Sequence, residues 1–185
     1  MECIEKINIS EEINWYKYYI TKGVRNKLFL AICEHQPILQ IARWQKYSRL
    51  SDFYEKRKSK NIIYKILFLY YTRKKNILGQ SLGLDLSTIH IGQGLKILHY
   101  NITINGNAII GNNLRLLGSN VIGNGGPNKL GCPIIGNDVI MGAGAKVLGP
   151  VCIADGITIA AGAIVVNSFT EKGITIAGVP AKKIK

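Results

Sequence analysis

The sequence predicts a mainly β domain built from stacked coils of short strands, with an α-helical segment before it. From residue 89 onward, aliphatic residues recur every six positions. That spacing fits neither the 3.6-residue period of a helix nor the alternation of a long strand. The composition also changes along the chain: 13 of the 15 aromatic residues precede position 72, whereas all but three glycines lie beyond position 85. We therefore expect two domains, residues 1–80 and residues 81–185.

The six-residue repeat is the most specific pattern in the chain. Its positions are Ile91, Ile97, Ile104, Ile110, Leu116, Ile122, Ile135, Met141, Val147, Ile153, Ile159 and Val165. Short strands joined by tight turns, three to a coil, meet this spacing, and stacked coils bury an aliphatic column that no single coil could bury. One extra residue separates Ile97 from Ile104. A longer interruption, "GNGGPNKLGCP" at 123–133, predicts a loop that leaves the wall of the coils.

The first domain is expected to contain three helices. Ser10 can cap a helix that opens with Glu11 and Glu12, whose charges suit the N-terminal end of the helix dipole. Pro37 can begin a second helix that continues to about residue 58. Residues 61–75 predict a third helix. Its apolar run at 62–71 is too short to span a bilayer and predicts a buried helix, although contact with a membrane surface stays open.

The chain is strongly basic, with a formal net charge of +13. Between Arg43 and Lys75 stand 11 basic residues against Asp52 and Glu55. Such a patch attracts anions, for example a CoA polyphosphate, an acidic glycan or an anionic membrane. A solvated helix face in a lysine-rich protein is the simpler interpretation. No RNA- or DNA-binding signature accompanies the patch, so we expect no nucleic-acid partner.

The cysteines and histidines suggest neither a disulfide framework nor a metal site. The four cysteines have no paired spacing, and no signal peptide opens the chain, which favours a cytoplasmic protein, at most at the inner face of the membrane. A zinc site shared between subunits needs about three imidazoles. The β domain offers only His90 and His99, nine residues apart, so we expect no metal and assign His90 to the surface.

Two stretches carry a family resemblance: "IIGNDVIMGAGAKVLGPVCIADGITIAAGAIVV" at 134–166 and "GVPAKKI" at 178–184. They are similar to the hexapeptide-repeat acyltransferases, in particular to serine acetyltransferases and related bacterial sugar and polysaccharide O-acetyltransferases. The resemblance covers roughly residues 82–185. It implies a left-handed parallel β-helix, a homotrimer, and acetyl-CoA as co-substrate.

The resemblance also implies a catalytic histidine. The segment "IGQGLKILH" at 91–99 matches the family segment whose histidine is the general base, which assigns that role to His99. Imidazole titrates near neutral pH and suits the removal of a hydroxyl proton. Asp85 is the candidate for orienting the ring. It stands one residue nearer the histidine than the family's aspartate, and ungapped matching places Leu84 there. A turn histidine and a corner aspartate are the structural alternatives.

For acetyl-CoA, the resemblance implies a groove between adjacent subunits. Backbone groups near Gly142, Ala143 and Ala161 would line the pantetheine arm, where small side chains permit close approach. Lys182, after the Gly-Val-Pro-Ala turn, would meet the CoA phosphates, and Lys183 would share that role. The alternative for these residues is a set of tight corners and a frayed basic tail.

The acceptor is expected to be a sugar hydroxyl, on a capsular or surface polysaccharide or its precursor. Serine acetyltransferases carry a charged Asp-Arg-His-Pro segment, and the matching residues here, 130–133, are Leu-Gly-Cys-Pro without any charge. Leu98 stands where those enzymes have an acidic residue. A desolvated amino acid needs partners for both of its charges. Serine O-acetylation stays the enzymatic alternative, an amino-sugar N-acetyltransferase is a further one, and a non-catalytic β-helix scaffold is the non-enzymatic one.

Overall fold

The computed structural model describes residues 8–21, 37–126 and 131–185. Within these residues the chain divides into two compact units, Asn8–Leu82 and Gly83–Lys185. The first is helical and the second is built from short strands, each around a core of its own.

The helical unit contains α1 (Ile9–Thr21), α3 (Pro37–Glu55) and α4 (Ile62–Leu82). Its core includes the fully buried rings of Tyr16 and Trp44. Helix α3 begins at Pro37 as expected, whereas α4 extends well beyond the expected residues 61–75. The expectation that α4 is a buried helix is wrong for its outer side, because Ile62, Ile66 and four other large apolar residues of the helix are exposed.

The start of α1 differs from the expectation in its capping residue. The side-chain oxygen of Asn8, not Ser10, accepts a hydrogen bond from the Glu11 N–H at 3.2 Å, and Ser10 lies inside the helix. Glu12 is buried rather than facing solvent at the helix end. Its carboxylate forms an ion pair with Arg49 at 2.9 Å and accepts a hydrogen bond from Gln45. Glu12 therefore joins α1 to α3, since a buried carboxylate needs a charged partner.

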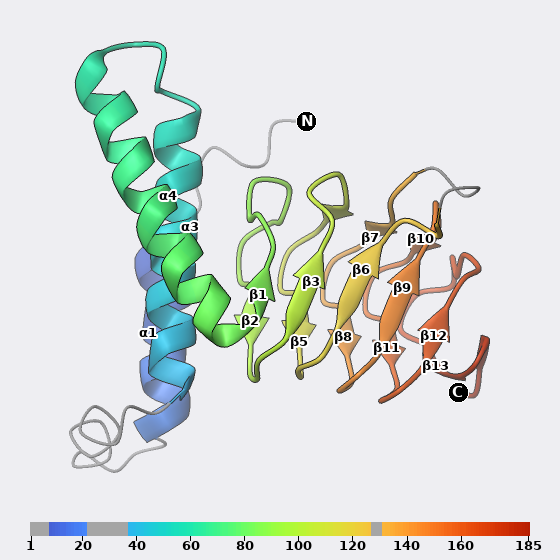
Figure 1. Ribbon diagram of the computed structural model, residues 1–185. Helices are drawn as coiled ribbons and strands as arrows, with labels where there is room; N and C mark the ends of the chain where they lie inside the picture. The colour runs from blue at the N-terminus through green and yellow to red at the C-terminus, as the bar shows by residue number, and fades with distance from the viewer. Residues whose placement is uncertain (1–7, 22–36, 127–130) are drawn as a thin grey trace. The chain divides into compact units, whose positions relative to one another are not determined.

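Helices α3 and α4 lie side by side (Figure 1) and contact through tyrosines. The rings of Tyr54 and Tyr71 stack with centroids 5.5 Å apart, and the hydroxyls of Ser51 and Thr72 lie 2.8 Å apart. Burial and the neighbouring tyrosines raise the pKa of Tyr71. These contacts identify the side of α4 that packs within its unit.

The second unit is a stack of coils with three parallel sheets, here called A, B and C (Figure 1). Sheet A contains β1 (Leu84–Asp85), β3 (Ile102–Ile104), β6 (Val121–Gly123), β9 (Lys146–Leu148) and β12 (Ile164–Val165). Sheet B contains β4 (Ile109–Ile110), β7 (Ile134–Ile135) and β10 (Cys152–Ile153). Sheet C contains β2 (Lys96–Ile97), β5 (Arg115–Leu116), β8 (Ile140–Met141), β11 (Thr158–Ile159), β13 (Thr175–Gly178) and β14 (Ala181–Lys183). Only the β13–β14 pair is antiparallel among these strands.

The repeat positions form the core of the coils, as the six-residue spacing predicts. Each of the twelve repeat residues is buried, with no more than 4% of its surface exposed. Residues next to them point outward, so that a strand such as β4 exposes Ile109 and buries Ile110. Because buried and exposed residues alternate within these short strands, the chain buries one aliphatic column and exposes the outer faces of the sheets to solvent.

The corner that leads from sheet C to sheet A, here called the C–A corner, repeats in every coil. On this corner Asn101, Ser119, Gly144 and Gly162 have a φ between 53° and 71°, and Gly118, next to Ser119, also has a positive φ. Gly83, which precedes the first strand of sheet A, has a φ of 62°. Glycine adopts this left-handed conformation freely, and Asn does so more readily than most residues. The corners therefore stack in register, and residues at equivalent corner positions lie next to one another in space.

A second type of corner, from sheet B to sheet C, contains a charge-linked tie. The Asp155 carboxylate accepts a hydrogen bond from the Asn137 N–H at 2.9 Å and lies 2.8 Å from the Lys172 ammonium. The hydrogen bond from Lys172, followed by that from Asn137, lowers the pKa of Asp155 below its ordinary value of 3.8. The tie therefore joins three successive coils.

We expect this tie to make the thermal stability of the β unit sensitive to acid. Because folding depresses the pKa of Asp155, its stabilisation is complete above pH 3.8 and is lost as the pH falls through the lower folded value. Melting curves of the wild type and Asp155→Asn should differ most near neutral pH and converge in acid. The control is Glu55→Gln, which removes an exposed pair with Lys58. Asp155→Asn curves that stay parallel to the wild type at all pH values would contradict the prediction.

Candidate active site

His99 lies on the C–A corner of the first coil, and its side chain is exposed. Five residues, 98–102, connect Ile97 to Thr103 there. The next coil connects Leu116 to Val121 with only four, 117–120, and the third and fourth coils also use four. The extra residue falls within the His99 corner and accounts for the irregular spacing between Ile97 and Ile104. A longer corner can bulge from the stack, which suits a side chain that must reach a substrate.

Gly118 stands directly beneath His99 in the next coil. A Cβ on Gly118 would lie 2.7 Å from the Cβ of His99 and 3.6 Å from its Cγ, and the φ of Gly118 is +114°. Because Gly118 has no side chain, the His99 side chain can occupy this space without a steric clash. Sequence reasoning missed this residue. Two similar segments, "LHYN" at 98–101 and "LGSN" at 117–120, occupy successive corners. Aligning them would have placed Gly118 opposite His99.

Asn120 connects the His99 corner to the following one. It is completely buried, and its side-chain oxygen accepts a hydrogen bond from the Gly118 N–H at 3.0 Å. Its amide group donates to the carbonyl oxygens of Gly142 at 2.7 Å and Ala145 at 3.3 Å. Asn120 stands two residues before the repeat residue Ile122, at a position that is apolar in the other coils. Its polar side chain is therefore an exception to the repeat, and we did not predict its role from the sequence. It fixes the backbone under the imidazole.

An open groove of about 600 Å³ runs along the C–A corner and the outer face of sheet A. Its lining residues are Gly83, Asn101, Thr103, Ser119, Val121, Gly144 and Lys146. Asn101 and Thr103 lie two and four residues beyond His99 in the chain, so the groove begins beside the histidine corner. Lys146 is the charged side chain among these lining residues, and it favours an anionic group in the groove.

Asp85 lies on β1, in register with Thr103 of the groove. Its side chain is exposed, whereas Leu84, which ungapped matching would place in the same role, is buried. Of the two positions, only Asp85 can present a group to the outside of the coil. Among the described residues, no hydrogen bond or ion pair joins Asp85 to His99. The assignment of Asp85 as the orienting carboxylate stays a prediction.

The small residues expected near acetyl-CoA lie on the C–A corners of the third and fourth coils. A Cβ on Gly142 would collide with the backbone nitrogen of Ala161 and would lie 2.8 Å from the carbonyl carbon of Ala160. Coil stacking therefore requires Gly142, whatever else the corner does. Ala143 and Ala161 are exposed, and the Ala143 carbonyl accepts a hydrogen bond from Gly162 at 2.8 Å. These corners present backbone close to the surface.

The two lysines of the tail have different surroundings. The ammonium of Lys183 lies 2.7 Å and 2.8 Å from the two carboxylate oxygens of Glu171, which already neutralise it. Lys182 is exposed on β14, opposite Ala177 of β13. Because β13 and β14 form a hairpin, the tail is not frayed, and Lys182 is the better candidate for binding a phosphate.

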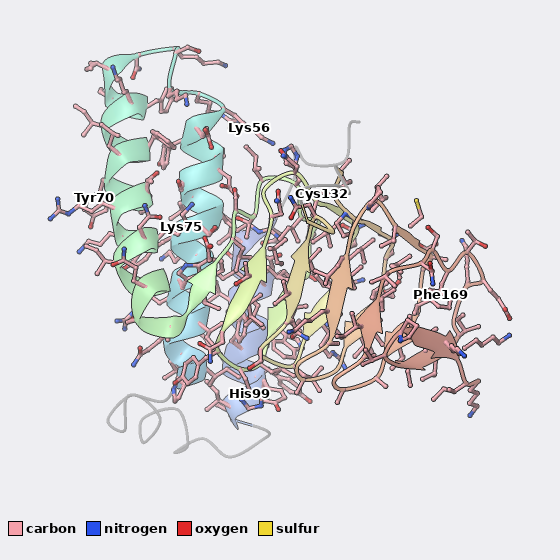
Figure 2. All side chains as sticks on the ribbon, turned by 45° about the vertical axis from the view of Figure 1, so that its right-hand side comes forward. Lys56, Tyr70, Lys75, His99, Cys132 and Phe169 are labelled. Atoms are coloured by element: carbon pink, nitrogen blue, oxygen red, sulfur yellow. The ribbon has the colours of Figure 1, made fainter. Side chains whose placement is uncertain are left out.

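Residues 131–133, at the end of the interruption, lie away from the His99 corner of the same chain (Figure 2). Cys132 precedes β7 of sheet B, and Figure 2 shows it and His99 at different edges of the coil stack. Leu130 lies outside the described residues. His90 is exposed on the sheet B side, as expected for a surface residue. Within 8–21, 37–126 and 131–185, no three His, Cys, Asp or Glu side chains are grouped as metal ligands would be.

We expect Gly118→Ala to lower the rate of catalysis without unfolding the protein. The added methyl group would push against the Cβ of His99, and a displacement of about 1 Å can cost roughly a hundredfold in rate. Initial rates and melting temperature measure the two effects. The control is Gly126→Ala, because Gly126 has a φ of +103°, close to the +114° of Gly118, but nothing within 4 Å of the new Cβ. Equal activity in both variants would show that Gly118 does not seat His99.

Solved structures of known proteins resemble the fold described above. No family model matches the sequence, and no curated protein matches it. Among solved structures, the chain is similar to the Neisseria gonorrhoeae serine acetyltransferase in complex with serine, with 25% identity, a TM-score of 0.65, and coverage of 96% of this chain and 69% of that chain. It is also similar to the serine acetyltransferase of Brucella abortus strain S19 in complex with coenzyme A, with 24% identity, a TM-score of 0.69, and coverage of 95% of this chain and 67% of that chain. A third such structure is the soybean serine acetyltransferase complexed with serine, with 21% identity, a TM-score of 0.60, and coverage of 95% of this chain and 69% of that chain.

The comparisons confirm the expected fold. The chain has the left-handed parallel β-helix that the family resemblance implies and the N-terminal helical segment that the sequence predicts. Its structural neighbours are acetyltransferases of the hexapeptide-repeat type. The chain spans about two thirds of the length of these neighbours.

Proposed function

We propose that the protein is an acetyl-CoA-dependent O-acetyltransferase with His99 as the general base. The observation that carries the proposal is the seating of an exposed imidazole on a one-residue-longer corner, above the side-chain-free Gly118 and beside an open groove. The similarity to serine acetyltransferases supports acetyl transfer as the reaction.

In the proposed reaction His99 removes the proton from a hydroxyl group of the acceptor. The resulting oxygen attacks the thioester carbonyl of acetyl-CoA, the C–S bond breaks, and His99 returns the proton to the departing thiolate. Asp85 would orient the imidazole and stabilise its protonated form once substrates close the site. Exposed backbone amides of the C–A corners supply donors for the developing oxyanion.

The C–A corners of the third and fourth coils fit the CoA arm. Ala143 and Ala161 are exposed and small, and close approach of a ligand to backbone needs both properties. Lys182 supplies a positive charge for the CoA phosphates, whereas Lys183 is held by Glu171. We therefore expect Lys182 to contribute more to acetyl-CoA affinity than Lys183. One neighbouring enzyme has coenzyme A bound, which agrees with this co-substrate.

L-Serine is the first candidate for the acceptor. Two of the similar enzymes are in complex with serine, so the comparisons favour this acceptor over the sugar hydroxyl expected from the sequence. Lys146, in the groove beside the histidine corner, could pair with the carboxylate of an amino acid.

A sugar hydroxyl is the second candidate, and a specific observation favours it. The residues that match the charged segment of serine acetyltransferases are uncharged, and Gly131–Pro133 provide no side-chain partner for an ammonium or a carboxylate. Because His99 and Cys132 lie at different edges of the coil stack (Figure 2), we expect the equivalent of that segment to reach the base from a neighbouring subunit. The proposed homotrimer would supply this arrangement.

The test is thiol release from acetyl-CoA by the purified protein, with L-serine, simple sugars, amino sugars and extracted surface glycan offered separately. Release that depends on serine supports the first candidate, and release that depends on sugar or glycan supports the second. If no acceptor yields thiol and calorimetry detects no binding of acetyl-CoA, the enzyme proposal is wrong and a scaffold role replaces it. Sedimentation velocity tests the trimer.

A further inference from the structure

Helix α4 presents an apolar face to solvent. Ile62, Ile66, Leu69 and Ile77 have between 57% and 66% of their surface exposed, and Tyr70 has 51%. Their spacing of three, four and eight residues places them on one side of the helix. Figure 2 shows Tyr70 directed away from α3. Isolated exposed apolar residues are ordinary, but a contiguous row along a helix marks an interaction surface.

This face is not needed for packing within the helical unit. The opposite side of α4 supplies the contacts to α3, through Tyr64 and Tyr71 beside Tyr54 and through Thr72 beside Ser51. Helix α4 is thus apolar on two sides, one packed and one exposed. Among the described residues of the helical unit, no side chain covers the exposed row.

The charge around this face is uniformly positive. From Lys56 to Leu82 the sequence contains eight Lys and Arg residues and no Asp or Glu. Three of the basic residues belong to α4 and are exposed: Lys65, Arg73 and Lys74. On a helical projection Arg73 falls within the apolar row, and Lys65 and Lys74 fall on its two flanks. Apolar residues bordered by cations are the pattern of a helix that lies in the interface of an anionic bilayer.

We propose that the exposed face of α4 docks on the surface of an anionic lipid membrane, with Ile62, Ile66, Leu69 and Ile77 among the acyl chains and the basic residues at the phosphates. The helix would lie in the plane of the interface. In the described ranges, no helix has the length and apolar content to cross a bilayer. Each Lys or Arg near an anionic surface contributes about fivefold in affinity, so the basic residues add substantially to the apolar contribution.

A second copy of the chain fits this face less well. Two such faces packed together would bring Lys65, Arg73 and Lys74 of both copies close to one another. The described part of the helical unit holds four carboxylates, on Glu11, Glu12, Asp52 and Glu55, and none is on α4. Glu12 is already paired with Arg49 and Glu55 with Lys58. Anionic lipid supplies the missing negative charge, and a second copy does not.

The experiment is flotation of the full-length protein with vesicles of phosphatidylcholine alone or with one-third phosphatidylglycerol. Two variants test the face: Ile66→Ser/Leu69→Ser removes apolar residues, and Lys65→Glu/Arg73→Glu/Lys74→Glu reverses charges. A control, Lys17→Glu/Arg43→Glu/Lys46→Glu, makes the same change in net charge at exposed positions of α1 and α3. Circular dichroism and melting temperature check that each variant is folded.

We expect the wild type to bind the anionic vesicles and not the neutral ones. The apolar variant should bind at least about tenfold more weakly, and the α4 charge variant about a hundredfold more weakly, with a much smaller loss in the control. Equal binding by the apolar variant and the wild type would overturn docking through α4. Absence of vesicle binding, with a particle mass that falls in the apolar variant, would show that the face joins copies of the chain instead. The flotation assay does not depend on acetyl transfer, so its result tests membrane docking independently of the proposed function.

Discussion

Replacing His99 with alanine is expected to lower the rate of acetyl transfer by about 10² to 10⁴-fold, the contribution of a positioned general base. The side chain is exposed and lies above Gly118, so its removal should leave the core intact. The free energy of unfolding should change by less than about 0.5 kcal/mol, as for other surface substitutions. Acetyl-CoA affinity should also persist, because the candidate residues for CoA lie on other corners.

The measurement is kcat and KM for both substrates, with calorimetric binding of acetyl-CoA and a denaturant melt on the same preparations. His90→Ala is the matched control, since it removes an exposed imidazole from the sheet B side and should retain wild-type rates. Asp85→Asn should lower kcat less than His99→Ala and leave KM nearly unchanged if Asp85 acts by orienting the ring. A His99→Ala enzyme with wild-type kcat would remove His99 from the mechanism.

The coil architecture could be predicted because its physics is local and repetitive. A six-residue aliphatic period is typical of short strands stacked in coils, and all twelve repeat residues are buried as expected. The same regularity identified the irregular corner, since the extra residue between Ile97 and Ile104 falls beside His99. Pro37 was informative for a similar reason, because proline restricts where a helix can begin.

Features that depend on contacts between distant residues could not be predicted in the same way. Ser10 and Asn8 are both good capping residues, and the local sequence does not distinguish them, whereas the structure shows Asn8 as the cap and Glu12 paired with Arg49 of another helix. The apolar run of α4 suggested burial, but hydrophobicity alone does not say on which side a partner lies. The role of Gly118 depends on the registration of two corners 19 residues apart.

Asn120→Ala is expected to lower the free energy of unfolding by about 2 to 3 kcal/mol, since it removes two buried hydrogen bonds and one partly buried one, which contribute about 1 kcal/mol each. Neighbouring coils carry Ile102, Ala145 and Ala163 at the equivalent position, all buried and apolar. An apolar residue is therefore tolerated by the column itself. The loss would come mainly from the buried Gly118 N–H, which would be left without its acceptor, whereas the Gly142 carbonyl keeps a hydrogen bond from the Ala145 N–H at 3.1 Å.

The substitution should also lower activity, because Asn120 holds Gly118 beneath His99 and Gly142 at the corner proposed for CoA. Asn120→Asp separates the two effects. An aspartate keeps an acceptor for the Gly118 N–H but cannot donate to Gly142 or Ala145, so its carboxylate would be buried facing carbonyl oxygens. Denaturant melts and initial rates on both variants are the measurement, with Asn105→Ala as control because its side chain makes only an exposed local hydrogen bond. If Asn120→Ala were as stable and active as Asn105→Ala, the seat of His99 would be set by coil stacking alone, and Asn120 would have no part in positioning the base.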